Sequence, residues 1–229
     1  MTRMEKNKKL LIVGAGEFAD IAYEYFTHDS EYEVIGFAVE AKYVTDAEKF
    51  GLKVHALEDV ASQVSPQEVE AHVAITSTSL NQVRERIVGL TRGLGYTLAN
   101  YVSSRAFVWH TATLGENVFI FENNVVQHGV TLGDGVILWS GNHIGHQSDI
   151  GAFAFVSSHV VISGYTRIGR RCFIGVNACF ADNLTLGDDC FVALGSVVNK
   201  SFADAGLILS GHHAEPSRVS AYRYFKVKA

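Results

Sequence analysis

A six-residue period runs from residue 108 to residue 198 and leaves few folds open to this part of the chain. Every sixth position in this range is aliphatic or Phe, sixteen times without a break, and the position after it is often glycine. An amphipathic helix repeats every 3.6 residues and a two-sided strand every two, so neither explains the period. An ordinary β-sandwich with coincidental spacing is the alternative, and sixteen consecutive matches argue against it. The stepped residues are Val108, Leu114, Ile120, Val126, Leu132, Leu138, Ile144, Ile150, Val156, Ile162, Ile168, Ile174, Phe180, Leu186, Val192 and Val198.

Six residues are enough for a short strand and a turn. Three such sides close a triangular coil of about 18 residues, and successive coils stack at the strand spacing of ~4.8 Å. In such a coil the stepped residue points inward and the small uncharged residue four places later fills the corner, and we expect the glycines to permit the tight turns. The sequence therefore predicts a parallel β-helix of about five coils. General rules favour right-handed crossovers, so the period by itself does not give the hand of the coil.

The N-terminal half has a different pattern, in which apolar strand segments alternate with helical periodicity. This alternation predicts a small open α/β sheet with Rossmann-like order. The chain is thus expected to be α/β plus β, with a Rossmann-like domain over residues 1–104 and a β-helix domain with a C-terminal tail over residues 105–229. We expect strands at 10–16, 33–40, 54–57, 71–78 and 96–102, and helices at 17–26 and 81–94.

A glycine turn joins the first expected strand to the first helix. Its sequence, Gly14-Ala15-Gly16-Glu17-Phe18-Ala19, resembles GxGxxA, a pattern that places backbone N–H groups and a helix dipole beside a phosphate. A tight turn without a ligand is the alternative, and Glu17 would put a negative charge beside any phosphate. An NAD site is less favoured, because only Glu40 could supply the acid at the end of the second strand. Glu40 and Thr76 are expected at the same edge of the sheet.

Three histidines stand in equivalent positions of successive coils. His110, His128 and His146 are 18 residues apart, each two places after a stepped residue, so they are expected to stack on one face. One interpretation is that the three histidines are stacked surface residues with no catalytic role. The other is a general base, because an imidazole with a pKa near ~6.5 can take a proton at neutral pH. Three cysteines, Cys172, Cys179 and Cys190, form no CxxC pair and predict neither a zinc site nor a disulfide framework.

Composition limits the remaining possibilities. The net charge of −5 argues against a nucleic-acid-binding protein, which usually presents a basic face. No apolar run approaches the ~20 residues that span a bilayer. The basic start followed by a short apolar run could mimic a signal peptide, but Glu17 and Asp20 follow closely and favour a buried first strand. We expect a cytoplasmic protein.

A Rossmann-like half fused to a hexapeptide β-helix resembles the bacterial sugar acyltransferases of the NeuD/PglD type. These enzymes acetylate sialic acids, UDP-bacillosamine precursors or other nucleotide-activated amino sugars. The resemblance is strongest over residues 171–198 and over WSGNHIGHQSDIG at 139–151. It implies a left-handed β-helix, acetyl-CoA as co-substrate, no metal, and a homotrimer with active sites in clefts between subunits. It also implies His146 as general base. Gln147 stands where the family usually has an acid, and Trp139 where an Asn is common.

The same resemblance places the ligands by position. Phe155, Val176 and Leu194 match the lining of the coenzyme A site, and the contacts to the nucleotide sugar match Gly14, Gly16, Glu17, Phe18, Glu40 and Thr76. The implied function is N-acetylation of a nucleotide-linked amino sugar in bacterial surface glycan biosynthesis. O-acetylation of the sialic acid type remains open, and so does a non-catalytic trimeric β-helix that binds a ligand, because Gln147 replaces the family acid.

Aromatic residues at non-core positions of the repeat predict where subunits meet. Exposed aromatic surface of this extent suggests an interface, so we expect these side chains to hold the homotrimer. They are Phe119, Phe121, Trp139, Phe153 and Phe155.

Overall fold

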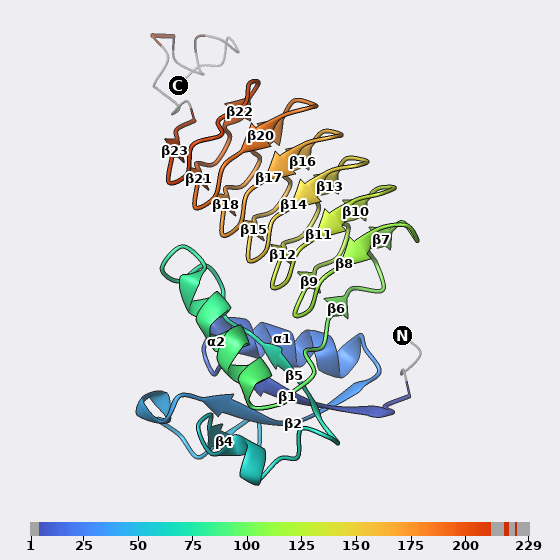
Figure 1. Cartoon of the computed structure of the whole chain (residues 1–229), viewed down its shortest axis with the longest axis vertical. Helices are drawn as coiled ribbons and strands as arrows, with labels where there is room; N and C mark the ends of the chain where they lie inside the picture. Colours follow the sequence, from blue (N-terminus) through green and yellow to red (C-terminus); the bar gives the residue numbers. More distant parts are fainter. Residues whose placement is uncertain (1–4, 212–217, 220–222, 224–229) are drawn as a thin grey trace.

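The computed structural model describes residues 5–211, 218–219 and 223 and has two parts (Figure 1). An α/β domain lies at the end of the β-helix that carries strands β6 and β9. Within the described residues, no helix is long and apolar enough to cross a membrane.

The α/β domain contains β1 (Lys8–Val13), α1 (Glu17–His28), β2 (Tyr32–Val39), β3 (Glu48–Lys49), β4 (Leu52–Ala56), β5 (Glu70–Val73) and α2 (Gln82–Gly93), with short 3₁₀ turns at Ala41–Tyr43 and Val60–Ser62.

The sheet of this domain has the order β3-β4-β2-β1-β5 and is parallel except for the β3–β4 pair. Strand β1 is central and its residues 10–13 are at most 1% exposed, because helices cover the sheet as in other parallel sheets. Helix α1 turns an apolar stripe that includes Phe18, Ala22 and Phe26 towards this core. The small Rossmann-like sheet expected from the sequence is confirmed.

Three of the expected strands are wrong in extent. The first, expected to reach residue 16, ends at Val13 and is followed by the glycine turn. Strand β5 ends at Val73, and the chain then leaves the sheet and takes left-handed conformations at residues 79–81. The segment expected as strand 96–102 contributes one isolated bridge between Leu98 and Ala71. Its last two residues, Tyr101 and Val102, form β6 and pair with the β-helix instead. Stacking onto the β-helix thus begins ahead of the expected domain boundary at residue 104.

The second part is a left-handed parallel β-helix whose strands are two residues long. Its strands are β6 (Tyr101–Val102), β7 (Phe107–Val108), β8 (Thr113–Leu114), β9 (Phe119–Ile120), β10 (Val125–Val126), β11 (Thr131–Leu132), β12 (Ile137–Leu138), β13 (His143–Ile144), β14 (Asp149–Ile150), β15 (Phe155–Val156), β16 (Val161–Ile162), β17 (Arg167–Ile168), β18 (Phe173–Ile174), β19 (Cys179–Phe180), β20 (Thr185–Leu186), β21 (Phe191–Val192), β22 (Val197–Val198) and β23 (Ile208–Leu209).

These strands form three parallel sheets, which the chain visits in rotation. Sheet 1 has the order β23-β21-β18-β15-β12-β9-β6, sheet 2 has β22-β19-β16-β13-β10-β7, and sheet 3 has β20-β17-β14-β11-β8. Paired residues are 18 positions apart, as in Val125 with His143. The stepped residues point inward and form one continuous core, which confirms the six-residue repeat.

The glycines of the repeat have a different role from the expected one. The left-handed position recurs every six residues, but it lies two places after the frequent glycine and is often occupied by other residues, such as Asn117, Gln147 and Asp189. A Cβ added at Gly133 or Gly145 would lie 2.6 Å from a backbone nitrogen of the next coil. These glycines therefore permit close stacking of neighbouring coils rather than the turn conformation.

The aromatic residues expected at a subunit interface lie instead against the chain's own α/β domain. Phe119 and Phe121 are at most 2% exposed, and Phe153 and Phe155 are at most 8% exposed. Phe18 of α1 packs against Phe119 and Phe121, with ring centroids 5.4 and 6.3 Å apart. The expectation of an exposed aromatic surface is wrong for Phe119, Phe121, Phe153 and Phe155, because the first domain docks on this side of the β-helix, whereas Trp139 is partly buried.

One buried histidine makes stability depend on pH. His72 of β5 is 1% exposed, its Nδ1 lies 2.9 Å from the carbonyl oxygen of Ala99, and burial lowers its pKa to about 4. Between its unfolded pKa of ~6.5 and this value the unfolded chain binds a proton that the folded chain does not. The free energy of unfolding is therefore expected to fall as pH decreases through this window, by up to about 1.4 kcal/mol per pH unit.

Urea unfolding at a series of pH values checks this expectation. His72→Phe keeps a ring between Phe26 and Phe119 but cannot titrate, so its stability should change less between neutral pH and about pH 4.5 than that of the wild type. Equal pH dependence in the two proteins would show that His72 does not carry the effect.

Candidate functional site

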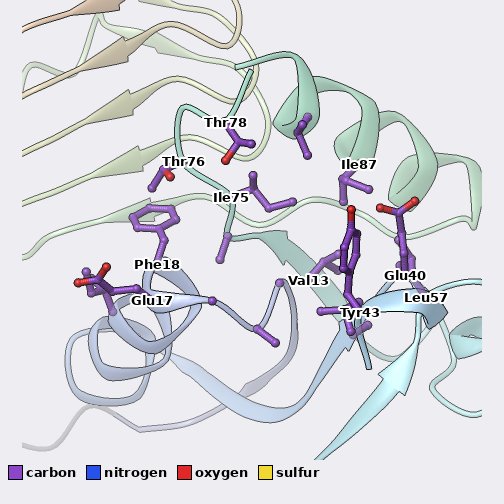
Figure 2. Close-up of a pocket in the computed structure, with 18 of the residues that line it drawn as sticks. Val13, Glu17, Phe18, Glu40, Tyr43, Leu57, Ile75, Thr76, Thr78 and Ile87 are labelled. Atoms are coloured by element: carbon purple, nitrogen blue, oxygen red, sulfur yellow. The ribbon is translucent and has the colours of Figure 1, made fainter. Parts of the chain in front are cut away.

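A cavity of about 670 Å³ opens at the carboxyl ends of β1, β2 and β5, beside the β-helix (Figure 2). This edge is where ligands of open parallel sheets bind. Figure 2 shows Glu17 and Phe18 on one side of the cavity and Glu40 and Tyr43 on the other. The residues that line it include Gly14, Gly16, Glu17, Phe18, Glu40 and Thr76, so the structure brings all six nucleotide-sugar candidates together. Trp139, from the β-helix, also lines it.

The glycine turn is shaped by a close approach of two backbones. Gly14 has φ +138°, and a Cβ there would lie 2.6 Å from the carbonyl oxygen of Ala74. Gly16 is the N-cap of α1, receives no side-chain cap, and has no atom within 4 Å of its Cβ position. The first N–H groups of α1 therefore begin in open space at the cavity, which is the arrangement that binds anions at a helix N-terminus.

The charged side chains of the cavity are acidic. Glu17 is exposed in the first turn of α1. Glu40 accepts two hydrogen bonds from Arg86, at 2.9 and 2.8 Å, and this contact holds the pKa of the Glu40 carboxyl below its usual range. Among the described residues, no Lys or Arg lines the cavity. An anionic ligand here would depend on backbone N–H groups rather than on direct contact with a cationic side chain.

His146 lies in the turn between β13 of sheet 2 and β14 of sheet 3. Its backbone N–H donates to Oε1 of Gln127 at 2.9 Å, and the same oxygen lies 3.4 Å from Nδ1 of the ring. Tyr165 packs edge-on against the ring at 5.1 Å. A Cβ at Gly164 would lie 2.7 Å from Cε1, so a glycine in the next coil leaves room for the imidazole. With Nδ1–H directed at Gln127, Nε2 is free to accept a proton.

Gln147 is not the partner of this ring. It occupies the left-handed position of its coil, with φ 57°, and its side chain extends over Gly129 of the preceding coil. Among the described residues, no hydrogen bond joins its side chain to His146. The residue that holds the imidazole, Gln127, was missed by sequence reasoning. The 18-residue register offered the signal, because Gln127 precedes the equivalent of His146 in the coil below, His128.

The three histidines occupy the same turn in successive coils, but their surroundings differ. His128 has its Nδ1 2.8 Å from the hydroxyl of Thr111, and the ring of His110 lies 5.1 Å from that of Trp109. None of the three lines the cavity. His146 is at the edge between sheets 2 and 3, whereas Trp139 follows β12 at the edge between sheets 1 and 2. Within one chain, sheet 2 separates the histidine from the cavity.

The three residues matched to coenzyme A do not lie together. Val176 and Leu194 occupy equivalent turns between sheets 1 and 2 and are 43% and 74% exposed. Phe155 is on the outer face of sheet 1 and is 8% exposed. It stacks on Phe173 at 5.2 Å, and Phe173 stacks on Phe191 at 5.1 Å. In the structure, Val176 and Leu194 thus lie in equivalent turns of neighbouring coils. Phe155 lies between the cavity and the stacked rings of Phe173 and Phe191.

The cysteines are poorly suited to act as nucleophiles. Cys172 and Cys190 are fully buried, as their corner positions predict, and burial raises the pKa of the Cys172 thiol to about 12. Cys179 points outward from sheet 2 and is half-buried. A thiol reacts as its thiolate, so the fully buried Cys172 is inert at neutral pH.

The outer faces of the three sheets differ in chemistry. The α/β domain covers the first coils of sheet 1. The outward residues of sheet 3 are polar: Thr113, Thr131, Asp149, Arg167 and Thr185. The outward residues of sheet 2 are mostly apolar: Phe107, Val125, His143, Val161, Cys179 and Val197. Phe107, Val161 and Val197 are 52%, 44% and 74% exposed, so sheet 2 presents an apolar face that is left open by residues 5–211, 218–219 and 223.

Both parts of the chain match models of known protein families. Residues 9–89 match the PglD N-terminal domain, residues 111–146 match the bacterial transferase hexapeptide repeats, and residues 165–200 match the hexapeptide repeat of succinyl-transferase. Comparison with curated proteins gives no match.

Solved structures with both parts are similar over nearly the whole chain. The acetyltransferase domain of PglB from Neisseria gonorrhoeae is 26% identical, with a TM-score of 0.77 over 92% of this chain and 100% of its own. The same domain in complex with acetyl coenzyme A is 27% identical with the same TM-score. PerB from Caulobacter crescentus, in complex with CoA and GDP-perosamine, is 25% identical, with a TM-score of 0.74 over 87% of this chain and 93% of its own.

Proposed function

We propose that this chain, a member of the NeuD/PglD-type sugar acyltransferases, is an acetyl-CoA-dependent N-acetyltransferase that acts on a nucleotide-linked amino sugar. The observation that carries the proposal is the cavity at the carboxyl edge of the Rossmann-like sheet, built against a hexapeptide β-helix in an architecture shared with acetyltransferases of this type. We place the reaction in the cytoplasm and in the synthesis of a bacterial surface glycan.

The cavity is proposed to hold the nucleotide sugar. The glycine turn and the open N-terminus of α1 offer N–H groups to the diphosphate, and apolar side chains such as Ile21, Val39 and Ile87 line the rest of the cavity. Trp139 closes the side next to the β-helix, where the sugar would leave the α/β domain. Phe155, Val176 and Leu194 stay proposed contacts of coenzyme A, and Val176 with Leu194 offers it an exposed apolar strip along the later coils.

We propose that a second chain completes the site. The cavity and His146 lie at opposite edges of sheet 2, and the face between them is apolar and is not covered by any described residue. Three chains that turn this face towards a common axis would bring the His146 edge of one subunit to the Trp139 edge of the next. We therefore propose a homotrimer held by sheet 2, with one active site between each pair of subunits.

The chemistry proposed for His146 is general base catalysis. The Nε2 atom takes a proton from the sugar amine as the nitrogen forms a bond to the thioester carbonyl carbon. Gln127 accepts the Nδ1–H and holds the tautomer. The carbon–sulfur bond then breaks, and the imidazolium returns the proton to the thiolate of coenzyme A. The amide and the free thiol are the products, and the amine itself is the nucleophile, so no residue of the chain is acylated.

Thiol release from acetyl-CoA tests the reaction directly. We expect turnover with UDP-, GDP- or dTDP-linked 4-amino sugars and much weaker turnover with the same sugars free of nucleotide. Acetylation of the hydroxyl analogue alone would indicate O-acetyl transfer instead. Binding of nucleotide sugars without thiol release for any member of the panel would favour the non-catalytic binding protein.

A charge added to the glycine turn should affect one substrate only. The Cβ position of Gly16 is in open space, so Gly16→Asp can be accommodated and would place a carboxylate beside the diphosphate. We expect the KM of the nucleotide sugar to rise by roughly tenfold or more and the KM of acetyl-CoA to stay unchanged. Gly89→Asp is the matched control, because it adds the same charge in open space on α2, outside the cavity. Equal effects on both KM values would place the diphosphate elsewhere.

A further inference from the structure

Arg84 of α2 is a buried cation without an anionic partner. It is fully buried, and among the described residues no carboxylate forms an ion pair with it. Its guanidinium donates instead to five carbonyl oxygens: Gly135 at 2.9 Å, Ile75 at 3.3 Å, Phe153 at 2.6 Å, Ala154 at 3.4 Å, and Thr76. Carbonyl dipoles satisfy its hydrogen bonds but leave a full positive charge inside the protein. Burial lowers its pKa to about 9, so the group is protonated at neutral pH.

This charge lies directly behind one wall of the cavity. Ile75 and Thr76 line the cavity and Arg84 does not, so the backbone of residues 75–76 stands between the guanidinium and the ligand space. The structure contains no cis peptide bond among its described residues. In a trans peptide the C=O and N–H groups point in opposite directions. The N–H groups of Thr76 and Ser77 therefore point away from Arg84, and in the described part of the chain neither donates a backbone hydrogen bond.

Residues 75–76, which form this wall of the cavity, are held in place by a following segment whose backbone conformation is strained. Ser79, Leu80 and Asn81 have φ values of 51°, 50° and 65°, three successive non-glycine residues in the left-handed region. Such residues persist only where the surrounding structure determines them. Asn81 is fully buried, and its Nδ2 donates to the carbonyl oxygens of Arg171 at 2.8 Å and Cys172 at 3.3 Å. Together with Arg84, this contact fixes the segment from residue 75 to residue 84 onto the β-helix.

We infer that Arg84 is a positioning residue that provides, through the backbone of residues 75–77, the positive potential that the cavity's own side chains lack. The charged side chains of the lining are Glu17 and Glu40, which oppose an anion. A buried charge is weakly screened, and the peptide dipoles that it orients carry its effect to the Thr76 and Ser77 N–H groups. The cavity thereby favours a nucleoside that carries a diphosphate over the uncharged nucleoside. The inference rests on the proposed function, because it assigns the anion to the nucleotide of the substrate.

Calorimetric binding of a charged and an uncharged ligand tests the inference. The probes are UDP and GDP, each compared with its nucleoside, uridine or guanosine. In Arg84→Gln, which keeps donors but no charge, we expect the diphosphate to bind roughly tenfold more weakly or worse, and the nucleoside to bind within about twofold of wild type. Arg84→Lys restores the charge and should recover most of the diphosphate affinity. Equal losses for both ligands in Arg84→Gln would show a structural role only and overturn the inference, as would no loss at all.

If Arg84→Gln does not fold, a measurement on the wild-type protein tests the inference instead. Hydrogen exchange at residues 75–77 should slow when UDP or GDP binds and change little with the nucleoside. Equal protection by both ligands, or by neither, would overturn the inference. Wild-type turnover is measured separately. Diphosphate binding of the expected pattern without acetyl transfer would contradict the proposed function and leave the role of Arg84 intact.

Discussion

His146→Ala is expected to lower kcat for acetyl transfer by roughly a hundredfold or more, which is the contribution of a positioned general base. Nε2 of His146 is the free acceptor of the ring, and Gln127 and Tyr165 hold the ring from the coils on either side. The protein should remain folded and keep its assembly, because the imidazole lies in a surface turn and the continuous core of the β-helix is unchanged. Steady-state kinetics by thiol release, with circular dichroism and sedimentation, measure all three properties.

His110→Ala is the matched control for this prediction. It removes an imidazole from the same turn position two coils away, where the ring lies against Trp109 and has no equivalent of Gln127 beside it. We expect nearly wild-type kcat in this variant. Wild-type turnover in His146→Ala, or an equal loss in both variants, would refute the assignment of the base.

Val161→Asp is expected to dissociate the proposed trimer and to abolish most activity with it. Val161 is 44% exposed near the middle of the apolar face of sheet 2, and burial of an unpaired carboxylate in an interface costs several kcal/mol. At micromolar concentration the variant should sediment as one chain of 25.0 kDa rather than as three. Activity should fall because each proposed site combines His146 of one subunit with the cavity of the next, and dissociation separates the two.

Thr131→Asp is the matched control for the interface. It introduces the same carboxylate at an outward position of sheet 3, whose outer face is polar and exposed. This variant should stay trimeric and active. A wild-type protein that sediments as a monomer at micromolar concentration would refute the trimer, and a trimeric Val161→Asp would show that the subunits meet through another face.

The β-helix and its register follow from the six-residue period of the sequence. Sixteen inward residues at a fixed spacing can be satisfied only by coils of three short sides, so the period predicts which residues form the core and which column each outward residue joins. The glycine turn and the strand ends at Glu40 and Thr76 could also be located, because carboxyl ends of parallel strands meet at one edge. These residues do lie around one cavity.

The packing of the two parts and the contacts of each outward face could not be predicted from the period and are known from the folded structure. The repeat marks Phe119 and Val161 alike as outward, yet Phe119 is fully buried against α1 and Val161 is half-exposed. The period describes contacts within one coil and between neighbouring coils, whereas the docking of the α/β domain joins residues far apart in the chain. For the same reason Arg84 has no signal in the sequence, since its carbonyl partners at residues 75, 76, 135, 153 and 154 meet only when the domains dock.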